Sequence, residues 1–192
     1  SVKTSLIVLI SLALLNVVVF AFVSINGLKK SFLNTESLHD DQFIPVDLMD
    51  EIRSAVYENH VLLLNARTNP VPFQIDISRD NLIKNQELVQ KKWAQVKDKF
   101  DKPLEKSKIT DLESAYQRYF SGSLAYLDSL KSIVQTEKNI NPANLQGREI
   151  EDIFNKIVIP SLNDIQKILG ELIQLKVTET ADLKKIDEEI YN

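Results

Sequence analysis

The fold is decided by residues 38–66, which read LHDDQFIPVDLMDEIRSAVYENHVLLLNA. Within this stretch, core-type side chains recur at spacings of three and four, the spacing of one helix face. They are Met49, Ile52, Val56, Asn59, Leu63 and Ala66. A neighbouring apolar stripe consists of Leu48, Ala55 and Leu62. Two stripes on one helix predict two partners, which are the rest of a helical bundle and another subunit.

This first helix is expected to run from Asn26 to about Arg67. A proline inside a helix removes a backbone hydrogen bond, so Pro45 should kink it. Residues 68–72 read TNPVP and should end it, because the two prolines cannot continue a regular helix.

Two further helices follow. The second is expected to begin near Ser78, a suitable N-cap, and to end at Pro103. Its heptad positions are Leu82, Gln86, Val89, Trp93, Val96 and Phe100. The third is expected to begin at about Thr110, where TDLE reads as a capping box, and to break at residues 139–144. Its face consists of Leu112, Tyr116, Tyr119, Ser123, Tyr126, Leu130 and Ile133.

The fourth helix is expected to begin near Gly147 and to contain Pro160. Its apolar positions are Ile150, Phe154, Ile157, Leu162, Ile165, Leu169, Leu172 and Leu175. Four amphipathic helices with short connections predict an all-α, up-down-up-down four-helix bundle. An even number of helices returns the chain to the end from which it entered. Residues 181–192 are therefore expected to lead toward a second membrane span.

The N-terminal part of the chain has a different composition. Residues 1–28 carry one charge, Lys3, and the stretch from Leu6 to Ile25 reads LIVLISLALLNVVVFAFVSI. Twenty helical residues can cross the hydrocarbon layer, so we expect a transmembrane helix at 1–28, continuous with the first helix of a bundle domain at 29–192. The rival interpretation is a cleaved signal peptide, for which residues 19–21 form a poor cleavage site.

Charge and composition exclude several classes of function. The chain of 192 residues has a net charge of −4, and beyond residue 30 there are 20 basic against 27 acidic side chains. This balance predicts no nucleic-acid partner. There is no cysteine, and the four glycines lie too far apart for a phosphate-binding loop. His39 and His60 lie far apart without a carboxylate cluster, so we expect no metal site, no cofactor and no enzymatic activity.

The chain resembles the four-helix-bundle ligand-binding domain of bacterial methyl-accepting chemotaxis proteins. The resemblance rests on the N-terminal span, on residues 38–66, and on the proline in the last helix, FNKIVIPSLNDIQKIL at 154–169. It implies an extracytoplasmic sensor domain of a transmembrane receptor in the inner membrane, with the bundle on the periplasmic side. It also implies a homodimer through the first helix and a small organic or amino-acid ligand, expected to be anionic.

Some alternatives stay open. Sensor histidine kinases and diguanylate cyclases carry the same kind of domain, and a membrane-tethered helical adaptor without a small ligand is a further reading. The positive-inside rule, applied to Lys3, Lys29 and Lys30 alone, favours the opposite orientation of the bundle.

The resemblance also implies a ligand site between two subunits. Arg53 looks like the first of the family's ligand-binding arginines, and Pro160-Ser161 looks like its Pro-Thr step. The other two arginines would fall at about Glu58 and Leu62, so an aspartate-type site is not implied.

A proline lacks an N–H, so carbonyls before it lose a helical partner. Backbone carbonyls of Lys156 and Ile159 could therefore receive a ligand ammonium, beside the hydroxyl of Ser161.

The residues themselves support two possible sites. Tyr57 and His60 share a helix stripe with Arg53, where the three could clamp an anion or simply form a solvated or dimer-contact face. Alternatively, Arg118 with Tyr119 and Tyr126 could form a pocket within one subunit, together with the neighbouring Tyr116. An aromatic stripe at helical spacing is also typical of a plain core.

Overall fold

The computed structural model describes residues 19–29, 43–137, 145 and 149–191, with side chains as far as residue 182. The chain divides into two units, Ser1–Phe43 and Ile44–Asn192. In the first unit, residues 19–29 are helical. Among the described residues, no helix combines the length and apolarity that a membrane crossing needs. Most of the predicted span, and its predicted continuation through residues 30–42, lie outside the described residues.

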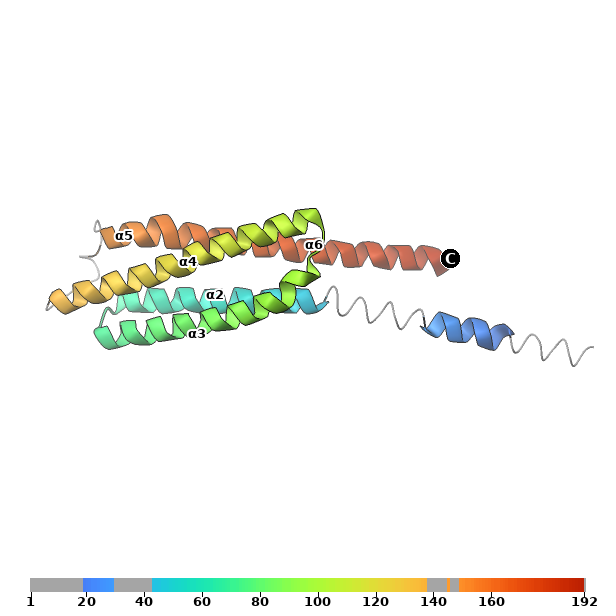
Figure 1. The fold of residues 1–192 in the computed structure, drawn as a ribbon, viewed down its shortest axis with the longest axis horizontal. Helices are drawn as coiled ribbons and strands as arrows, with labels where there is room; N and C mark the ends of the chain where they lie inside the picture. Colours follow the sequence, from blue (N-terminus) through green and yellow to red (C-terminus); the bar gives the residue numbers. More distant parts are fainter. Residues whose placement is uncertain (1–18, 30–42, 138–144, 146–148, 192) are drawn as a thin grey trace, which may run out of the picture. The chain divides into compact units, whose positions relative to one another are not determined.

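The second unit consists of four helical rods (Figure 1). They are α2 (Ile44–Thr68), α3 (Pro72–Val96), α4 (Pro103–Thr136) and a composite rod of α5 (Glu149–Ile153), the π-helix η4 (Phe154–Val158) and α6 (Ile159–Tyr191). A short 3-10 helix, η2 (Lys97–Lys99), follows α3. Both α2 and α4 pack against α3 and α6, which closes the bundle. The described secondary structure is entirely helical, which confirms the all-α four-helix bundle.

The predicted heptad faces form the core. All six first-stripe positions of α2, from Met49 to Ala66, are buried. They pack with Leu82 and Val89 of α3, with Leu130 of α4, and with further apolar positions of α6. Buried apolar area of this kind supplies most of the stability of a helical domain, because isolated helices are marginal in water.

The predicted start of the second helix is wrong. α3 begins at Pro72, a residue that suits the first helical turn because it needs no N–H partner there. Ser78 is not an N-cap but a buried residue inside α3, and its hydroxyl donates to the carbonyl of Leu62 at 3.2 Å. The turn before it packs Ile75 fully into the core.

The predicted start of the third helix is also too late. α4 begins at Pro103, and Glu105 accepts a hydrogen bond from the backbone N–H of Lys102 at 3.2 Å. Thr110 lies within the helix, where its hydroxyl donates to the carbonyl of Lys106 at 3.0 Å. Pro103 therefore opens α4, while α3 has already ended at Val96.

The last rod contains an extra residue in one turn. In η4, the N–H of Ile159 reaches back five residues to the carbonyl of Phe154, as in a π-helix. The predicted core position Ile157 is 42% exposed, and Val158 is buried in its place. One inserted residue thus changes the phase of the helix just before Pro160. Such π-bulges inside α-helices are frequent at functional sites.

The prediction that Leu48, Ala55 and Leu62 face another subunit is wrong for the first two residues. Leu48 and Ala55 are buried within the bundle, because α3 packs along this side of α2. The large apolar side chains that α2 leaves exposed are Tyr57, Val61 and Leu64. Pro45 lies in the first turn of α2, and the kink predicted within a longer helix extends onto residues 30–42, outside the described residues.

Candidate functional site

A cavity of about 420 Å³ lies within the bundle, beside α3 and α4. Its inner wall is apolar and draws on all four rods, with Ile52 of α2, Val89 of α3, Leu112 of α4 and Ile165 of α6. Small-molecule sites in proteins have volumes of roughly 300–1,000 Å³ and are mostly apolar with a few polar groups. The cavity therefore has the size and lining of a ligand site.

Two aromatic residues border this cavity. Trp93 of α3 donates a hydrogen bond through Nε1 to Oε1 of Glu113 on α4, at 2.5 Å. Tyr116 of α4 is buried, and its hydroxyl has no hydrogen-bond partner among the described residues. Burial raises the pKa of Tyr116, which keeps the phenol protonated and able to donate.

The predicted ligand face of α2 is on the surface of the bundle. Arg53 Nη1 pairs with Asp50 Oδ1 at 2.9 Å, and both side chains are exposed. Tyr57 is 61% exposed. His60 is half-buried, and its ring stacks on Phe154 with centroids 6.1 Å apart. Burial lowers the pKa of His60, so the imidazole favours its neutral form.

The predicted contacts on the last rod differ in exposure. Lys156 is exposed and pairs with Asp152 at 2.9 Å, Ile159 is half-buried, and Ser161 is buried. Within the described chain, no ion pair or hydrogen bond joins Arg53 to the last rod.

The alternative pocket does not bring its three residues together. Arg118 is on the surface and pairs with Asp164 at 3.3 Å. Tyr119 is fully buried, and its hydroxyl donates to the carbonyl of Val56 at 3.4 Å. Tyr126 is also fully buried, and its ring packs against Phe154. Both tyrosines are part of the core.

A polar cluster that the sequence did not reveal surrounds Phe154. We call it the Phe154 cluster; its members are His60, Arg67, Tyr126, Glu151 and Phe154. Arg67 pairs with Glu151 at 2.6 Å, and its guanidinium lies 4.7 Å from the Phe154 ring centroid. The Tyr126 ring lies 5.1 Å from the same centroid. Nδ1 of His60, the hydroxyl of Tyr126 and Oε1 of Glu151 are buried without hydrogen-bond partners among the described residues.

The family of the chain is shown by comparison with known proteins. A family model described as a four helix bundle sensory module for signal transduction matches residues 1–191. The chain belongs to this family. Searches of curated proteins and of solved structures gave no match.

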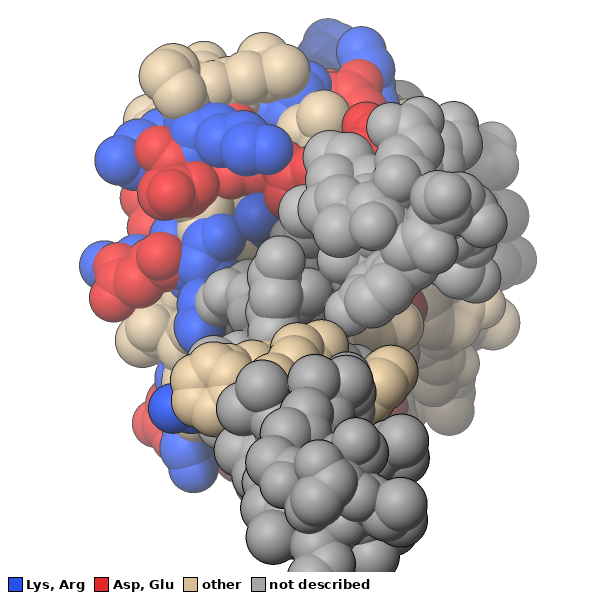
Figure 2. All heavy atoms as spheres, turned by 90° about the vertical axis from the view of Figure 1, so that its right-hand side faces the viewer, with Lys and Arg blue, Asp and Glu red and all other residues tan. Residues whose placement is uncertain are grey.

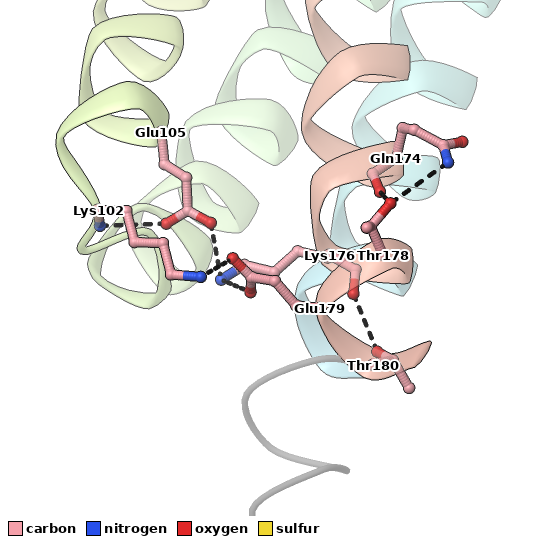
Figure 3. Close-up of polar contacts among 7 residues, drawn as sticks. All are labelled: Lys102, Glu105, Gln174, Lys176, Thr178, Glu179 and Thr180. Atoms are coloured by element: carbon pink, nitrogen blue, oxygen red, sulfur yellow. Dashed lines mark hydrogen bonds and ion pairs between the residues drawn. The ribbon is translucent and has the colours of Figure 1, made fainter. Parts of the chain in front are cut away.

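In this sensory module, a group of ion-paired charges joins α6 to the start of α4 (Figure 3). We call it the Lys176 network; it comprises Lys102, Glu105, Lys176 and Glu179. Lys176 is almost fully buried, 3.2 Å from Oε1 of Glu105 and 3.3 Å from Oε2 of Glu179. Lys102 also pairs with Glu179. Every member of the network thus faces an opposite charge.

On one face of the molecule, charges of both signs are mixed (Figure 2). Figure 2 shows Lys and Arg side chains interspersed with Asp and Glu side chains on the face drawn there. Within the described part of the chain, no group of His, Asp or Glu side chains is arranged to hold a metal ion.

Proposed function

We propose that this sensory module is the extracytoplasmic ligand-binding domain of a transmembrane chemoreceptor in a bacterial inner membrane. In this role it binds a small anionic molecule, has no catalytic activity, and passes a conformational change along α6. The match of the family model over residues 1–191 carries the proposal. A change in the packing of α2 or α4 would be passed on to α6, because α6 packs against both helices.

The exposed face of α2 supports a homodimer. Tyr57, Val61 and Leu64 lie at i, i+4 and i+7, so they share one side of the helix, and each is more than a third exposed. A row of large apolar side chains in water favours association with a matching surface. In a two-fold dimer the same row would meet its copy.

The position of Arg53 supports a ligand at this interface. Arg53 lies one turn before Tyr57 on the same side of α2, and its only described ion pair is the exposed contact with Asp50. An exposed ion pair of this kind contributes little, so a ligand carboxylate could take Asp50's place at low cost. A guanidinium binds a carboxylate through two parallel hydrogen bonds, which gives it an advantage over lysine.

The ligand site is tested by calorimetry of the chain against a panel of organic and amino acids. Arg53→Ala removes a charge-assisted hydrogen bond of roughly 1.5–3 kcal/mol, which corresponds to about 10- to 150-fold weaker binding. Arg79→Ala is the matched control, because Arg79 forms a comparable surface pair with Asp128 on other helices. A ligand that binds wild type and Arg53→Ala equally well would refute the interface site.

The dimer is tested by cysteine crosslinking in membranes. The chain has no cysteine of its own, so every disulfide must come from the introduced residue. Tyr57→Cys and Leu64→Cys are expected to form disulfide-linked dimers on mild oxidation. Ser121→Cys, at an exposed position of α4, is expected to stay monomeric. Equal crosslinking at all three positions would mean random collision and would count against an interface on α2.

A further inference from the structure

We propose that the cavity beside α3 and α4 is a second, intrasubunit binding site for a small molecule with an apolar ring and one anionic or hydrogen-bond-accepting end. The site lies inside one bundle and is separate from the exposed Arg53 face of α2, so it goes beyond the function proposed above. A bundle with this site could sense a ligand as a single subunit.

The inner end of the cavity selects an apolar group. Ile52, Val89, Leu112 and Ile165 offer no hydrogen bond from their side chains, so a charged group placed among them would lose its hydration without compensation. An apolar cavity of about 150 Å³ is enough to hold benzene. The 420 Å³ present here can therefore hold a substituted ring.

The outer end of the cavity selects a polar group. Gln90 and Lys97 from α3 and η2, and Gln117 from α4, line it at exposed positions. The Lys97 ammonium has no ion-pair partner within the described part of the chain, whereas Glu113 already accepts the Trp93 indole N–H. The carboxylate or hydroxyl of such a ligand would contact Lys97 and the two glutamine amides, while the ring of the ligand lies in the apolar inner end.

Access to the cavity passes the small side chain of Ala94. Ala94 is exposed on α3 and also lines the cavity, so a larger residue there would fill the opening from the solvent side without entering the core. Gln90 lies one turn earlier on the same helix and offers a second position of this kind.

The test uses the indole N–H signal of Trp93 in nuclear magnetic resonance spectra of the chain in lipid nanodiscs. Trp93 is the only tryptophan of the sequence, and its side chain borders the cavity, so its signal reports on this site. The probes are benzoate, benzyl alcohol and acetate. Benzoate is expected to shift the signal saturably, and acetate, which has the charge without the ring, is expected to give no saturable shift.

Three variants determine where benzoate binds. Ala94→Phe and Gln90→Phe are each expected to weaken binding at least tenfold, and because both positions are exposed, at least one variant should retain the wild-type circular dichroism. Lys97→Met should weaken benzoate by about two- to fivefold and leave benzyl alcohol unchanged, since an exposed charge pair contributes little. Arg53→Ala should bind benzoate like wild type, which separates this site from the α2 face. Absence of a saturable shift, or unchanged binding in folded Ala94→Phe and Gln90→Phe, would overturn the proposal.

Discussion

The Phe154 cluster and the Lys176 network both hold the last helical rod, but they satisfy their polar groups differently. In the Lys176 network, every charged group has an ion-pair partner, although Oε1 of Glu105, 3.2 Å from the Lys176 ammonium, has no hydrogen-bond partner among the described residues. In the Phe154 cluster, three buried polar atoms have no partner among the described residues, and the π-helix η4 begins at the same point. A buried polar atom without a partner costs about 1–3 kcal/mol. The rod is therefore well fixed near Lys176, and it can rearrange near Phe154 with less loss of free energy.

The largest expected effect comes from breaking the buried ion pair of the Lys176 network. Lys176→Met leaves the buried Glu105 carboxylate without its cation and is expected to lower the free energy of unfolding by about 3–5 kcal/mol. Replacing both partners, as in Lys176→Met with Glu105→Leu, should recover most of that loss, because an apolar pair needs no compensation. Urea unfolding followed by circular dichroism measures both. A double variant as unstable as the single one would mean that the charges are not coupled.

A second prediction concerns the close approach of α4 to η4. A Cβ atom added at Gly122 would lie 2.8 Å from Cγ2 of Ile157, so Gly122→Ala is expected to lose about 1–3 kcal/mol of stability through overpacking. Gly170 on α6 has nothing within 4 Å of such a Cβ. Gly170→Ala should therefore gain about 0.5–1 kcal/mol from helix propensity. Thermal unfolding of the two variants should show shifts of opposite sign, and two upward shifts would show that η4 gives way without cost.

A third prediction compares two buried tyrosines. Tyr126→Phe removes a hydroxyl that has no partner among the described residues, so stability should stay the same or rise by up to about 1 kcal/mol. Tyr119→Phe removes the hydrogen bond to the carbonyl of Val56 and should cost up to about 1 kcal/mol. Equilibrium unfolding of the matched pair checks this. If Tyr126→Phe is the more damaging of the two, its hydroxyl has a partner and the contrast between the two ends is weaker.

The smallest expected effect is the dependence of stability on pH. Burial alone would raise the pKa of Glu179, but its hydrogen bond from Lys102 and the charge of Lys176 together lower it. Glu179 therefore contributes stability above its unfolded pKa, about 4.3, and this contribution is lost as the pH falls through the lower folded pKa.

Burial lowers the pKa of His60 from 6.5, so the unfolded chain binds the proton more readily. Stability should consequently begin to fall as the pH drops below about 6.5. His60→Gln should remove that part of the pH profile and leave the acidic part intact. A profile unchanged by His60→Gln would show that the ring is not buried in solution.

The spacing of apolar residues predicts the helix faces because burial follows helical periodicity. It does not predict where the helices begin. A cap contributes about 1 kcal/mol, whereas burying an isoleucine contributes about 1.5–3 kcal/mol. Ile75 precedes Ser78, and Ile109 precedes Thr110, and both isoleucines are buried. The earlier turns are therefore helical, and both cap-like residues lie inside helices.

The candidate sites depend on packing that no local pattern records. Arg67 and Glu151 pair at 2.6 Å although 84 residues separate them in sequence. The cavity is a void between rods, and its volume depends on how closely α3 approaches α4. By contrast, the stripe of Arg53, Tyr57 and His60 follows directly from helical spacing, and the structure places all three on one helix as expected.

The π-helix in the last rod has a consequence for the direction of movement. An α-helix has 3.6 residues per turn, so each residue occupies about 100° of rotation. If η4 became a regular α-helix, α6 would have to absorb one residue by turning about its own axis, and its core side chains would then face different neighbours. A ligand that changed the balance between the two forms near Phe154 would act on α6 as a twist rather than as a slide, and the ion pairs of Lys176 would oppose that twist.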